Sequence, residues 1–463
     1  MPSPLNAAVL AVLGLATLTT ASQVLTRPAK AQTFRNPILP AGQDPSVVFD
    51  AGFYHLVQSD EDGISVRTSL TLTGLGNAKK TVVWRGGQDD SPCCELWAPE
   101  LVRWGDRWYI YYAADDGRNE NHRMYVLESR RPGGPYTFKG KISDPTNRWA
   151  IDGTVFQAPD GQRYYLWSGW EGTTNVQQNL YISRMRNPWT LQGERVLISS
   201  PEQPWELNGS PYINEGPEVL MRGGRVFVVY SASGSWTNDY CLGWLSLQGS
   251  VLDPKAWRKS NGCVFSRNDE ASVFAPGHNT FVKSPDGSED WQLFHANEIA
   301  GSSWGGRSVR AQKVSWNPDG TPRFGRPTAF SAALPLPSGE YEAEQARLVG
   351  VEVRETSLAS GGQAARLDSR TDRLELRVRA PKAGAYTLRV RFANGSGRAA
   401  RQTISVNGAA TKVSYASGGW ENFGSRPLAV RLRTGENEVK FAQDTGAVQI
   451  DAVTLTPADT ASR

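Results

Sequence analysis

The hydrophobic pattern along the chain is typical of β-strands, and predicted helices are nearly absent. One pattern returns five times: a turn with Gly or charged residues, followed by an aromatic-rich strand that ends in small residues. The copies are AGFYHLVQS (51–59), GDRWYIYYAA (105–114), GQRYYLWSGW (161–170), GGRVFVVYSAS (223–233) and, more loosely, SEDWQLFHAN (288–297). A repeat of this size predicts an all-β, five-bladed β-propeller. A sandwich with fortuitous hairpins is the alternative.

The repeat stops after about Phe330, where the pattern changes. The stretch SAALPLPSGEYEAEQ reads as a linker, and shorter, cleanly alternating strands follow it, as in RLELRVRAP and AYTLRVRFANG. These strands predict a β-sandwich (jelly-roll) of about 120 residues. The predicted organisation is a signal peptide (1–31), a propeller domain (32–332), a linker (333–340), a sandwich domain (341–458) and a frayed tail (459–463).

A polar residue in a Gly/Pro setting lies about eight to thirteen residues before the aromatic run of each copy. The five residues are Asp44 in GQDPS, Glu100 in LWAPEL, Asp152 in AIDGTVF, Glu215 in INEGPEV and His278 in APGHNTF. The first strand of each propeller blade lines the central channel, so equivalent positions converge. Converging carboxylates repel one another and shift their pKa values, which costs stability unless they serve a purpose. For each acid taken alone, the alternative is that it is an ordinary turn residue without a functional role.

Charge and composition narrow the class of protein. The net charge of +4 is small for 463 residues, and no basic run interleaves with aromatic residues. We therefore do not expect nucleic acid as a partner. The 16 Trp, 15 Tyr and 15 Phe suit sugar binding, because flat rings stack on the apolar faces of sugars, but large β-proteins also use aromatic residues in their cores.

The N-terminus resembles a secretory signal. Residues 7–21 form an apolar segment too short for a membrane span, and the A-x-A motif at 29–31 predicts cleavage before Gln32. The segment before it has no Lys or Arg, which leaves a lipidated or uncleaved anchor as an alternative. No other segment is apolar enough to span a bilayer. We therefore expect a secreted protein with no membrane partner, and a monomer.

Four cysteines are compatible with disulfides in an oxidising compartment. Cys241 and Cys263 are plausible partners. Cys93 and Cys94 are adjacent, so they form either a vicinal bridge or unpaired or differently paired thiols. Their spacing does not indicate zinc, because no second Cys or His pair lies nearby.

Three of the repeated acids fit the needs of glycoside hydrolysis. That reaction uses one protonated carboxyl group that gives its proton to the leaving oxygen and a second that attacks or activates water. A third acid nearby keeps the general acid protonated by like-charge repulsion. Asp44, Asp152 and Glu215 would fill these roles, and no cofactor is needed for such chemistry.

The ordered motifs NPILPAGQDPSVVFD, LWAPEL, IDGTVF, NEGPEVL and GRSVRAQKVSW resemble glycoside hydrolase family 43 over about residues 34–332. The resemblance implies a five-bladed propeller and an inverting mechanism. It matches Asp44 to the general base, Glu215 to the general acid and Asp152 to the residue that tunes and positions the acid. It matches Arg307 to a substrate-binding arginine.

The resemblance also implies that His278 touches a channel calcium ion or its waters. Imidazole is an unusual calcium ligand, so a hydrogen-bonding role in the channel is the alternative. Glu100 has no catalytic counterpart and is interpreted as a packing or subsite residue. Trp97, and more weakly Trp170, are candidate sugar platforms, and each could equally be a core residue.

The C-terminal domain resembles carbohydrate-binding modules of families 6 and 35, on motifs such as YEAEQARL, AGAYTLRVRFANGSG, GGWENFG and TGENEVKFAQDTGAVQIDAVTL. Glu342, Glu344 and Asp451 match the oxygen ligands of a structural calcium ion, which carboxylates suit. Trp420 is the best stacking candidate, with a packing residue at the sandwich edge as the alternative, and Asn394 is expected near the same loops.

Within the family, CCELWAPE, LWSGWEG and YSASGSWTNDYCLG resemble the branch of α-L-arabinofuranosidases, which release terminal arabinose from plant-type arabinan or arabino-oligosaccharides. A β-xylosidase, an endo-arabinanase or a β-galactosidase on the same scaffold is the first alternative, because loops at the channel mouth set the substrate. A non-catalytic sugar-binding protein is the second. A retaining fructan-type propeller is a further rival, and it would need a shorter separation between its carboxyl groups.

Overall fold

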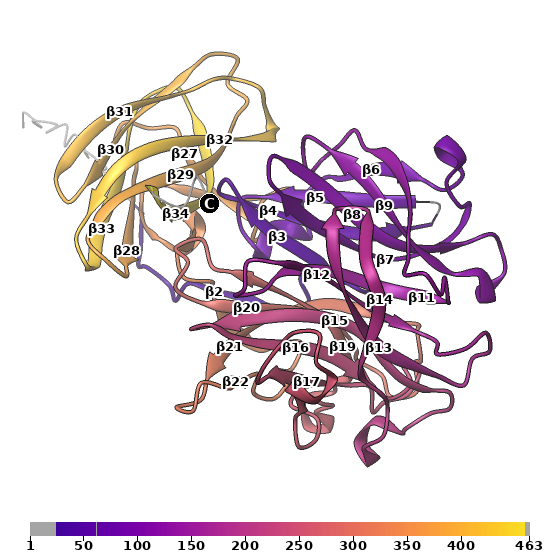
Figure 1. Cartoon of the computed structure of the whole chain (residues 1–463). Helices are drawn as coiled ribbons and strands as arrows, with labels where there is room; N and C mark the ends of the chain where they lie inside the picture. Colours follow the sequence, from indigo (N-terminus) through magenta and orange to yellow (C-terminus); the bar gives the residue numbers. More distant parts are fainter. Residues whose placement is uncertain (1–24, 62, 459–463) are drawn as a thin grey trace, which may run out of the picture.

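The computed structural model describes residues 25–61 and 63–458, and these fold into two β-domains (Figure 1). Helical structure in them is confined to three-residue 3-10 turns. The prediction of an all-β protein is confirmed. Across the described residues, we find no helix with the length and apolar character needed to cross a membrane.

The first domain consists of five four-stranded units that follow one another along the chain, each antiparallel within itself. A short parallel pairing of residues 177–178 with 212–213 joins the third and fourth units. Unit I contains β3 (Ser46–Asp50), β4 (Phe53–Asp60), β5 (Gly63–Ser69) and β6 (Lys80–Arg85), and unit II contains β7 (Cys94–Trp104), β8 (Arg107–Asp115), β9 (Arg123–Ser129) and β10 (Thr137–Ile142). Unit III contains β11 (Ala150–Gln157), β12 (Arg163–Gly169), β13 (Gln177–Asn187) and β14 (Thr190–Ser199), and unit IV contains β15 (Tyr212–Arg222), β16 (Arg225–Ala232), β17 (Cys241–Leu247) and β18 (Trp257–Lys259). Unit V contains β19 (Phe274–Lys283), β20 (Asp290–Asn297), β21 (Ser308–Trp316) and β22 (Pro322–Arg323).

The first strands of the units form the inner wall of a closed ring. Each of β3, β7, β11, β15 and β19 packs against the first strand of the next unit, and β19 packs against β3. The ring is also tied where the chain enters and leaves it: β2 (Thr33–Arg35) pairs with β23 (Ala333–Pro335), and Leu39 exchanges two backbone hydrogen bonds with Val309. The five first strands therefore face one axis, which is the arrangement of a propeller.

The repeated aromatic-rich sequences form the second strand of each unit, namely β4, β8, β12, β16 and β20. Large aromatic side chains from all five of these strands are fully buried, among them Tyr54, Tyr111, Tyr165, Tyr230 and Phe294. They fill the space between neighbouring units. The repeat visible in the sequence is therefore the packing pattern of the second strands.

The second domain is a sandwich of two antiparallel sheets. One sheet has the strand order β1 (Thr26–Arg27), β25 (Arg347–Val349), β28 (Arg373–Ala380), β33 (Gly435–Thr445), β30 (Ala400–Val406) and β31 (Ala409–Tyr415). The other has β26 (Glu352–Glu355), β27 (Gln363–Leu367), β34 (Val448–Pro457), β29 (Gly384–Asn394) and β32 (Gly419–Leu432), with β24 (Glu340–Glu342) paired to β34. Alternate side chains of both sheets, such as Leu376, Val378, Leu388 and Val390, form one core. The sandwich prediction is confirmed.

The two domains are packed together through specific contacts. The backbone N–H of Leu72 in unit I donates to Glu340 Oε1 at 2.7 Å, and Asn77 Nδ2 donates to the carbonyl of Ala359 at 2.7 Å. The Arg389 guanidinium lies 4.8 Å from the centre of the Phe53 ring. The sandwich therefore rests on the outer part of unit I.

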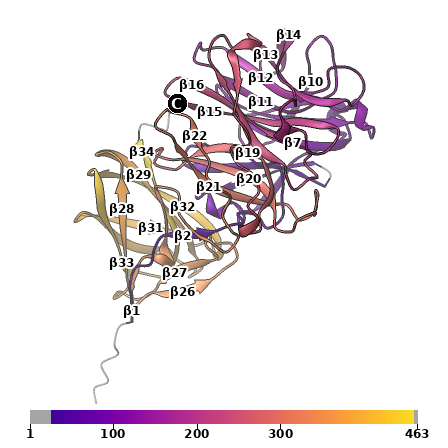
Figure 2. The same cartoon turned by 90° about the horizontal axis from the view of Figure 1, so that it is seen from below.

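Two predicted boundaries differ from the structure. The predicted linker 333–340 contains β23 and the first residue of β24, so its two ends are built into the two domains. Residues 25–31, expected at the end of the signal segment, include β1, which pairs with β25 of the sandwich (Figure 2). The apolar part of the predicted signal and the tail 459–463 lie outside the described residues, and cleavage before Gln32 stays a prediction.

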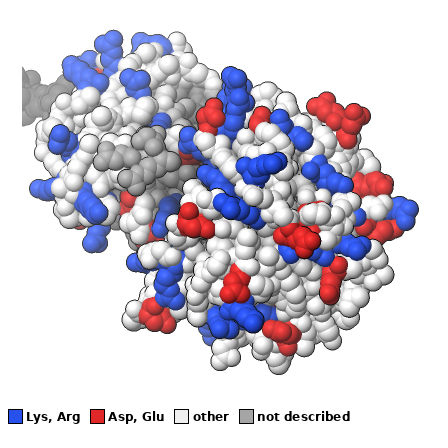
Figure 3. Space-filling view, in the orientation of Figure 1, with Lys and Arg blue, Asp and Glu red and all other residues white. Residues whose placement is uncertain are grey.

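All four cysteines are paired. Cys93 and Cys94 form a vicinal disulfide, and Cys241 is bonded to Cys263. The alternative of unpaired thiols at 93 and 94 is therefore excluded. On the face shown in Figure 3, acidic and basic side chains are intermixed over the first domain, whereas basic side chains predominate over the sandwich.

Candidate active site

A residue with left-handed backbone geometry lies in the first strand of units II to V, and in unit I it lies two residues before β3. These residues are Asp44 (φ 45°), Ala98 (φ 39°), Asp152 (φ 55°), Gly216 (φ 53°) and His278 (φ 45°). In units II to V the hydrogen-bond register shifts across this residue and the one after it, as in a β-bulge. Bulges re-aim side chains, and left-handed non-glycine residues cluster at functional sites. The four bulges, together with the left-handed Asp44 just before β3, therefore turn one residue of each unit toward the axis.

This alignment corrects the sequence-based one in two units. Glu100 was aligned with Asp44 and Asp152, but Ala98 holds the equivalent position in unit II and Glu100 lies two residues farther along β7. In unit IV the equivalent residue is Gly216, and Glu215 immediately precedes it. Asp44, Asp152 and His278 are equivalent, as predicted.

Asp44 is surrounded by nitrogen-containing side chains. Its Oδ1 lies 3.2 Å from Nδ1 of His278, 3.2 Å from Nδ1 of His295 and 3.9 Å from Nη1 of Arg307. Burial by itself would raise the pKa of Asp44, but these neighbours outweigh burial and hold the pKa below its usual value. Asp44 is therefore a carboxylate throughout the neutral and mildly acidic range.

Glu215 has the opposite character. Burial, and then the nearby charge of Asp44, raise its pKa to about 7, although a hydrogen bond from Tyr240 acts against this rise. The pKa of Asp152 lies well above its usual value because of burial, then the charges of Glu215 and Asp44. The Gly216 N–H donates to Asp152 Oδ2 at 3.0 Å and fixes that side chain. At neutral pH this acidic pair retains a proton close to an ionised Asp44.

Sequence reasoning missed two residues of this centre, His295 and Tyr240. Both are buried. Tyr240 donates from its hydroxyl to Glu215 Oε1 at 2.8 Å, and its ring is parallel to that of His295, with centroids 5.8 Å apart. The two side chains therefore connect the surroundings of Asp44 with Glu215. The repeat gave no signal for them, because Tyr240 precedes a third strand and His295 lies in a second strand.

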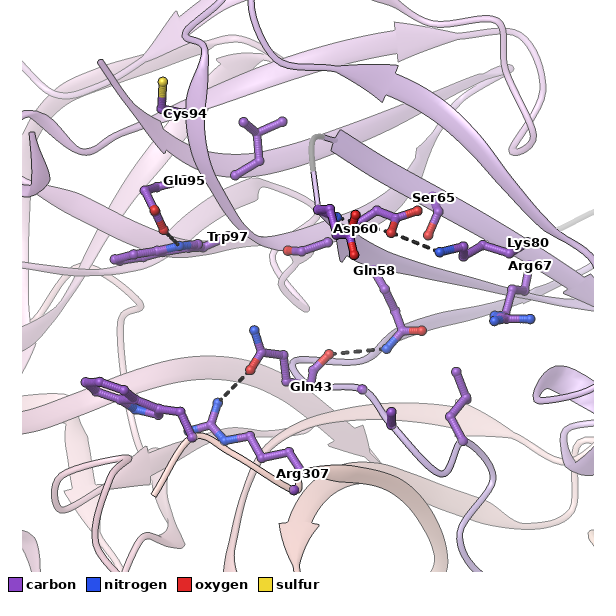
Figure 4. Close-up of a pocket in the computed structure, with 18 of the residues that line it drawn as sticks. Gln43, Gln58, Asp60, Ser65, Arg67, Lys80, Cys94, Glu95, Trp97 and Arg307 are labelled. Atoms are coloured by element: carbon purple, nitrogen blue, oxygen red, sulfur yellow. Dashed lines mark hydrogen bonds and ion pairs between the residues drawn. The ribbon is translucent and has the colours of Figure 1, made fainter. Parts of the chain in front are cut away.

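An open cleft of about 730 Å³ adjoins this centre. Arg307 lies between the cleft and Asp44, and donates to Gln43 Oε1 at 3.2 Å and to the Ser235 carbonyl at 3.0 Å. Figure 4 shows Arg307 and Gln43 on one side of the cleft, across from Trp97 and Glu95. The structure thus places Arg307 where a bound molecule would meet it.

The structure separates the two candidate sugar platforms of the catalytic domain. Trp97 is half-buried and lines the cleft, where its ring stacks on His122 with a centroid distance of 4.0 Å. Trp170 is only 4% exposed and stacks on Trp149, with centroids 4.7 Å apart. Trp170 is therefore a core residue, and its prediction as a platform is wrong. His122 also contacts Trp149 edge-on, so Trp170 belongs to the aromatic packing that supports Trp97.

A second pair of acids lies deeper along the axis. Glu100 donates a hydrogen bond to Glu218, and burial followed by the charge of Glu218 raises the pKa of Glu100 well above its usual value. Burial raises the pKa of Glu218 to about 7. The Val219 N–H donates to Glu218 at 2.9 Å, and the Thr154 hydroxyl does so at 3.4 Å. Glu100 is therefore a packing residue that retains a proton.

In the sandwich, the two candidate sugar contacts also differ. Trp420 is half-buried, and the Arg366 guanidinium lies 4.2 Å from the centre of its ring. Asn394 is 1% exposed, and its amide donates to the carbonyls of Arg398 and Tyr415 while its oxygen accepts from Ser396. Asn394 lies next to the Trp420 segment, as expected, because it pairs with Gly419. Its side-chain amide is already hydrogen-bonded within its own loop, so it is not placed to contact a sugar.

The three carboxylates predicted to bind calcium in the sandwich do come together. Ser360 donates to both Glu342 and Asp451, and Glu344 lies beside the neighbouring Gly361, with its Oε2 buried and unpaired. However, Arg391 forms an ion pair with Asp451. Within residues 25–61 and 63–458, no group of three or more His, Cys, Asp or Glu side chains is arranged to hold a metal ion. Calcium here, and at His278, stays a prediction.

Comparison with known proteins assigns each of the two domains to a family. Residues 34–322 match glycosyl hydrolases family 43, and residues 339–458 match the carbohydrate binding module of family 35. The chain belongs to glycosyl hydrolase family 43. The resemblance inferred from the motifs is therefore confirmed, and this family 43 protein is a glycosidase with a carbohydrate-binding module. Its substrates are accordingly polysaccharides or oligosaccharides.

Individual relatives cover most of this family 43 chain. It is 35% identical to the extracellular exo-α-(1→5)-L-arabinofuranosidase of Streptomyces avermitilis over 336 residues, which are 70% of this chain and 69% of the relative. It is 34% identical to the protein of the same name from Streptomyces chartreusis over 274 residues, 57% of this chain and 83% of the relative. The crystal structure of α-L-arabinofuranosidase from Lactobacillus brevis aligns with a TM-score of 0.60 and 33% identity, covering 65% of this chain and 98% of that one.

Proposed function

We propose that the protein is a secreted, inverting exo-α-L-arabinofuranosidase that releases terminal arabinose from arabinan or arabino-oligosaccharides. The observation that carries the proposal is the separation of the pKa values of two carboxyl groups in one buried centre. His278, His295 and then Arg307 hold the pKa of Asp44 below its usual value, whereas burial raises the pKa of Glu215 to about 7. Such a separation assigns a base and an acid at the same pH.

In this proposal Asp44 is the general base. Its carboxylate takes a proton from water as the water oxygen attacks the anomeric carbon of the terminal sugar. His278 and His295 hold the carboxylate in place, and Arg307 faces the substrate from the adjoining cleft. Attack by water from the side opposite the leaving group inverts the configuration at that carbon.

Glu215 is the general acid. It gives its proton to the glycosidic oxygen as the bond to the anomeric carbon breaks, and the shortened chain departs as an alcohol. Tyr240 fixes the carboxyl group through its 2.8 Å hydrogen bond. Asp152 is fixed by Gly216 next to Glu215, and the repulsion between these two acids favours a proton on the pair.

The specificity and the secretion are supported by separate observations. The two Streptomyces relatives and the Lactobacillus brevis structure carry the names of arabinofuranosidases, and the former are named extracellular. The two disulfides suit an oxidising compartment outside the cytosol. The sandwich would raise the local enzyme concentration by tethering it to a polymeric substrate.

Product analysis on debranched linear arabinan tests the proposal, with an aryl α-L-arabinofuranoside and an aryl β-D-xyloside as companions. We expect arabinose from the first time point, without oligosaccharides, and inversion in the proton NMR spectrum of the first-formed product. Early oligosaccharides would indicate an endo-arabinanase, and hydrolysis of only the xyloside would indicate a β-xylosidase. Turnover of none of them would favour a sugar-binding protein.

A further inference from the structure

The cleft beside Asp44 has an exposed tryptophan on its rim. Trp304 is 59% exposed, lies in the connection between β20 and β21, and lines the cleft together with Arg307. Ligand clefts are lined predominantly by apolar and aromatic side chains with a few polar groups, so an aromatic side chain on the rim of such a cleft is placed to contact a bound molecule. The expectations from sequence did not include this residue.

Trp304 is held in position although it is exposed. Its Nε1 donates to the Ser235 hydroxyl at 3.1 Å, and its ring stands edge-on to Trp236, with centroids 6.1 Å apart. The connection itself is bonded to unit IV through the Gly301 N–H, which donates to Asn238 Oδ1 at 2.8 Å. A contact surface that is already ordered loses less entropy when a ligand binds.

Trp97 supplies a second indole to the same cleft, from unit II. The stacking of its ring on His122 supports it, and its Nε1 donates to Glu95 Oε2 at 2.9 Å. Arg307, which precedes β21, lies on the same lining and within 3.9 Å of Asp44. The lining therefore combines a reacting end near Asp44 with two aromatic side chains from units II and V.

We propose that Trp304, with Trp97, forms the subsite for the sugar on the leaving-group side of the cleaved bond. This inference rests on the proposed function, because it assigns part of the same cleft. The apolar C–H face of a furanose ring would pack on the indole of Trp304, and its hydroxyl groups would remain available to polar residues of the lining such as Gln43 and Glu95. Trp304 is thus a positioning and specificity residue that takes no part in proton transfer.

Steady-state kinetics of Trp304→Ala on arabinotriose test the inference, with competitive inhibition by L-arabinose as the companion measurement. Arabinose occupies the reacting-sugar site alone. We expect KM for arabinotriose to rise about tenfold, equivalent to about 1.4 kcal/mol. We expect kcat within about threefold of the parent value and an unchanged inhibition constant for arabinose. Trp304→Phe should restore most of the loss.

Ile299→Ala is the matched control. Ile299 lies in the same connection and is 72% exposed, but it is absent from the cleft lining. It should leave all three constants unchanged. An unchanged KM in Trp304→Ala, or an equal weakening of arabinose binding, would overturn the inference.

Failure of the proposed function is a separate result, seen when the parent enzyme releases no arabinose from arabinotriose. The same comparison is then made with the oligosaccharide that the parent does hydrolyse and with its terminal monosaccharide as inhibitor. A KM effect of Trp304→Ala on that oligosaccharide alone would support the subsite, and none would refute it.

Discussion

Removal of the Tyr240 hydroxyl should move the alkaline limit of activity upward. Tyr240 donates to Glu215 Oε1 at 2.8 Å inside a buried site. A donated hydrogen bond stabilises the ionised carboxylate, so it lowers the pKa of Glu215, which burial has raised to about 7. In Tyr240→Phe that stabilisation is lost and the pKa rises further.

The size of the shift follows from the hydrogen bond. A hydrogen bond to a charged group contributes about 1.5–3 kcal/mol, and one pKa unit corresponds to about 1.36 kcal/mol. The shift is therefore about one to two units. In its proposed role as general acid, Glu215 must be protonated, so activity falls as the pH rises through this pKa. The midpoint of the alkaline limb of the pH profile should therefore move from about pH 7 to about pH 8 or above.

The assay is kcat/KM on arabino-oligosaccharides between pH 4 and 10, with Tyr111→Phe as the control. Tyr111 is also buried and donates to a backbone carbonyl, that of Pro188, at 2.7 Å, so the control loses a comparable hydrogen bond away from the acid. With an aryl substrate whose leaving group needs no proton, kcat/KM should show no alkaline fall in the parent or in either variant. An alkaline limb that stays in place or moves downward in Tyr240→Phe would refute the reasoning.

Three further substitutions probe the acids of the axis. Asp44→Ala should reduce kcat by about 10²–10⁴ with an unchanged melting temperature, and retained activity would contradict its role as base. Glu215→Gln should lose most activity on arabino-oligosaccharides and less on an activated aryl glycoside, whereas equal losses would argue against an acid. Glu218 has a folded-state pKa of about 7 against an ordinary value of 4.5, so the folded protein loses stability as pH rises between these values. The Gln side chain of Glu218→Gln cannot ionise, so the variant does not lose this stability. Its free energy of unfolding relative to the parent should therefore rise by on the order of 1–3 kcal/mol from pH 5 to pH 8, as measured by thermal unfolding. An equal stability difference at both pH values would contradict this.

The sequence predicted the architecture well because the relevant signals are local. Each second strand of the catalytic domain has its own aromatic run and its own preceding turn. The strands at 53–60 and 225–232 can therefore each be predicted from their local sequence alone. The sandwich strands alternate in the same local way, as in 373–380. A side chain's burial is less local. Trp170 and Trp97 have similar local sequences, but Trp170 is stacked on Trp149 within a buried cluster that also contains Tyr181.

The members of the site that sequence reasoning missed arise from contacts between distant segments. His295 meets Asp44 across 251 residues of chain, and Tyr240 reaches Glu215 from the approach to another strand. Neither lies at the position that the repeat marks in the inner strands. Spacing within one repeat could not reveal them, because it describes a unit and not the packing between units.

The misaligned acids show how a repeated backbone geometry accommodates different chemistry. Units I and III place an Asp at the left-handed position, whereas unit IV places Gly216 there. A Cβ atom on Gly216 would lie 3.1–3.4 Å from the imidazole of His278, so a side chain there would be crowded against the neighbouring unit. The carboxyl group of unit IV comes from the preceding residue, Glu215, where Tyr240 can bind it, and the freed backbone N–H of Gly216 binds Asp152. The offset of one residue thus moves Glu215 out of the position that Asp44 and Asp152 occupy in their units, and it lets unit IV carry Glu215 while its backbone binds Asp152.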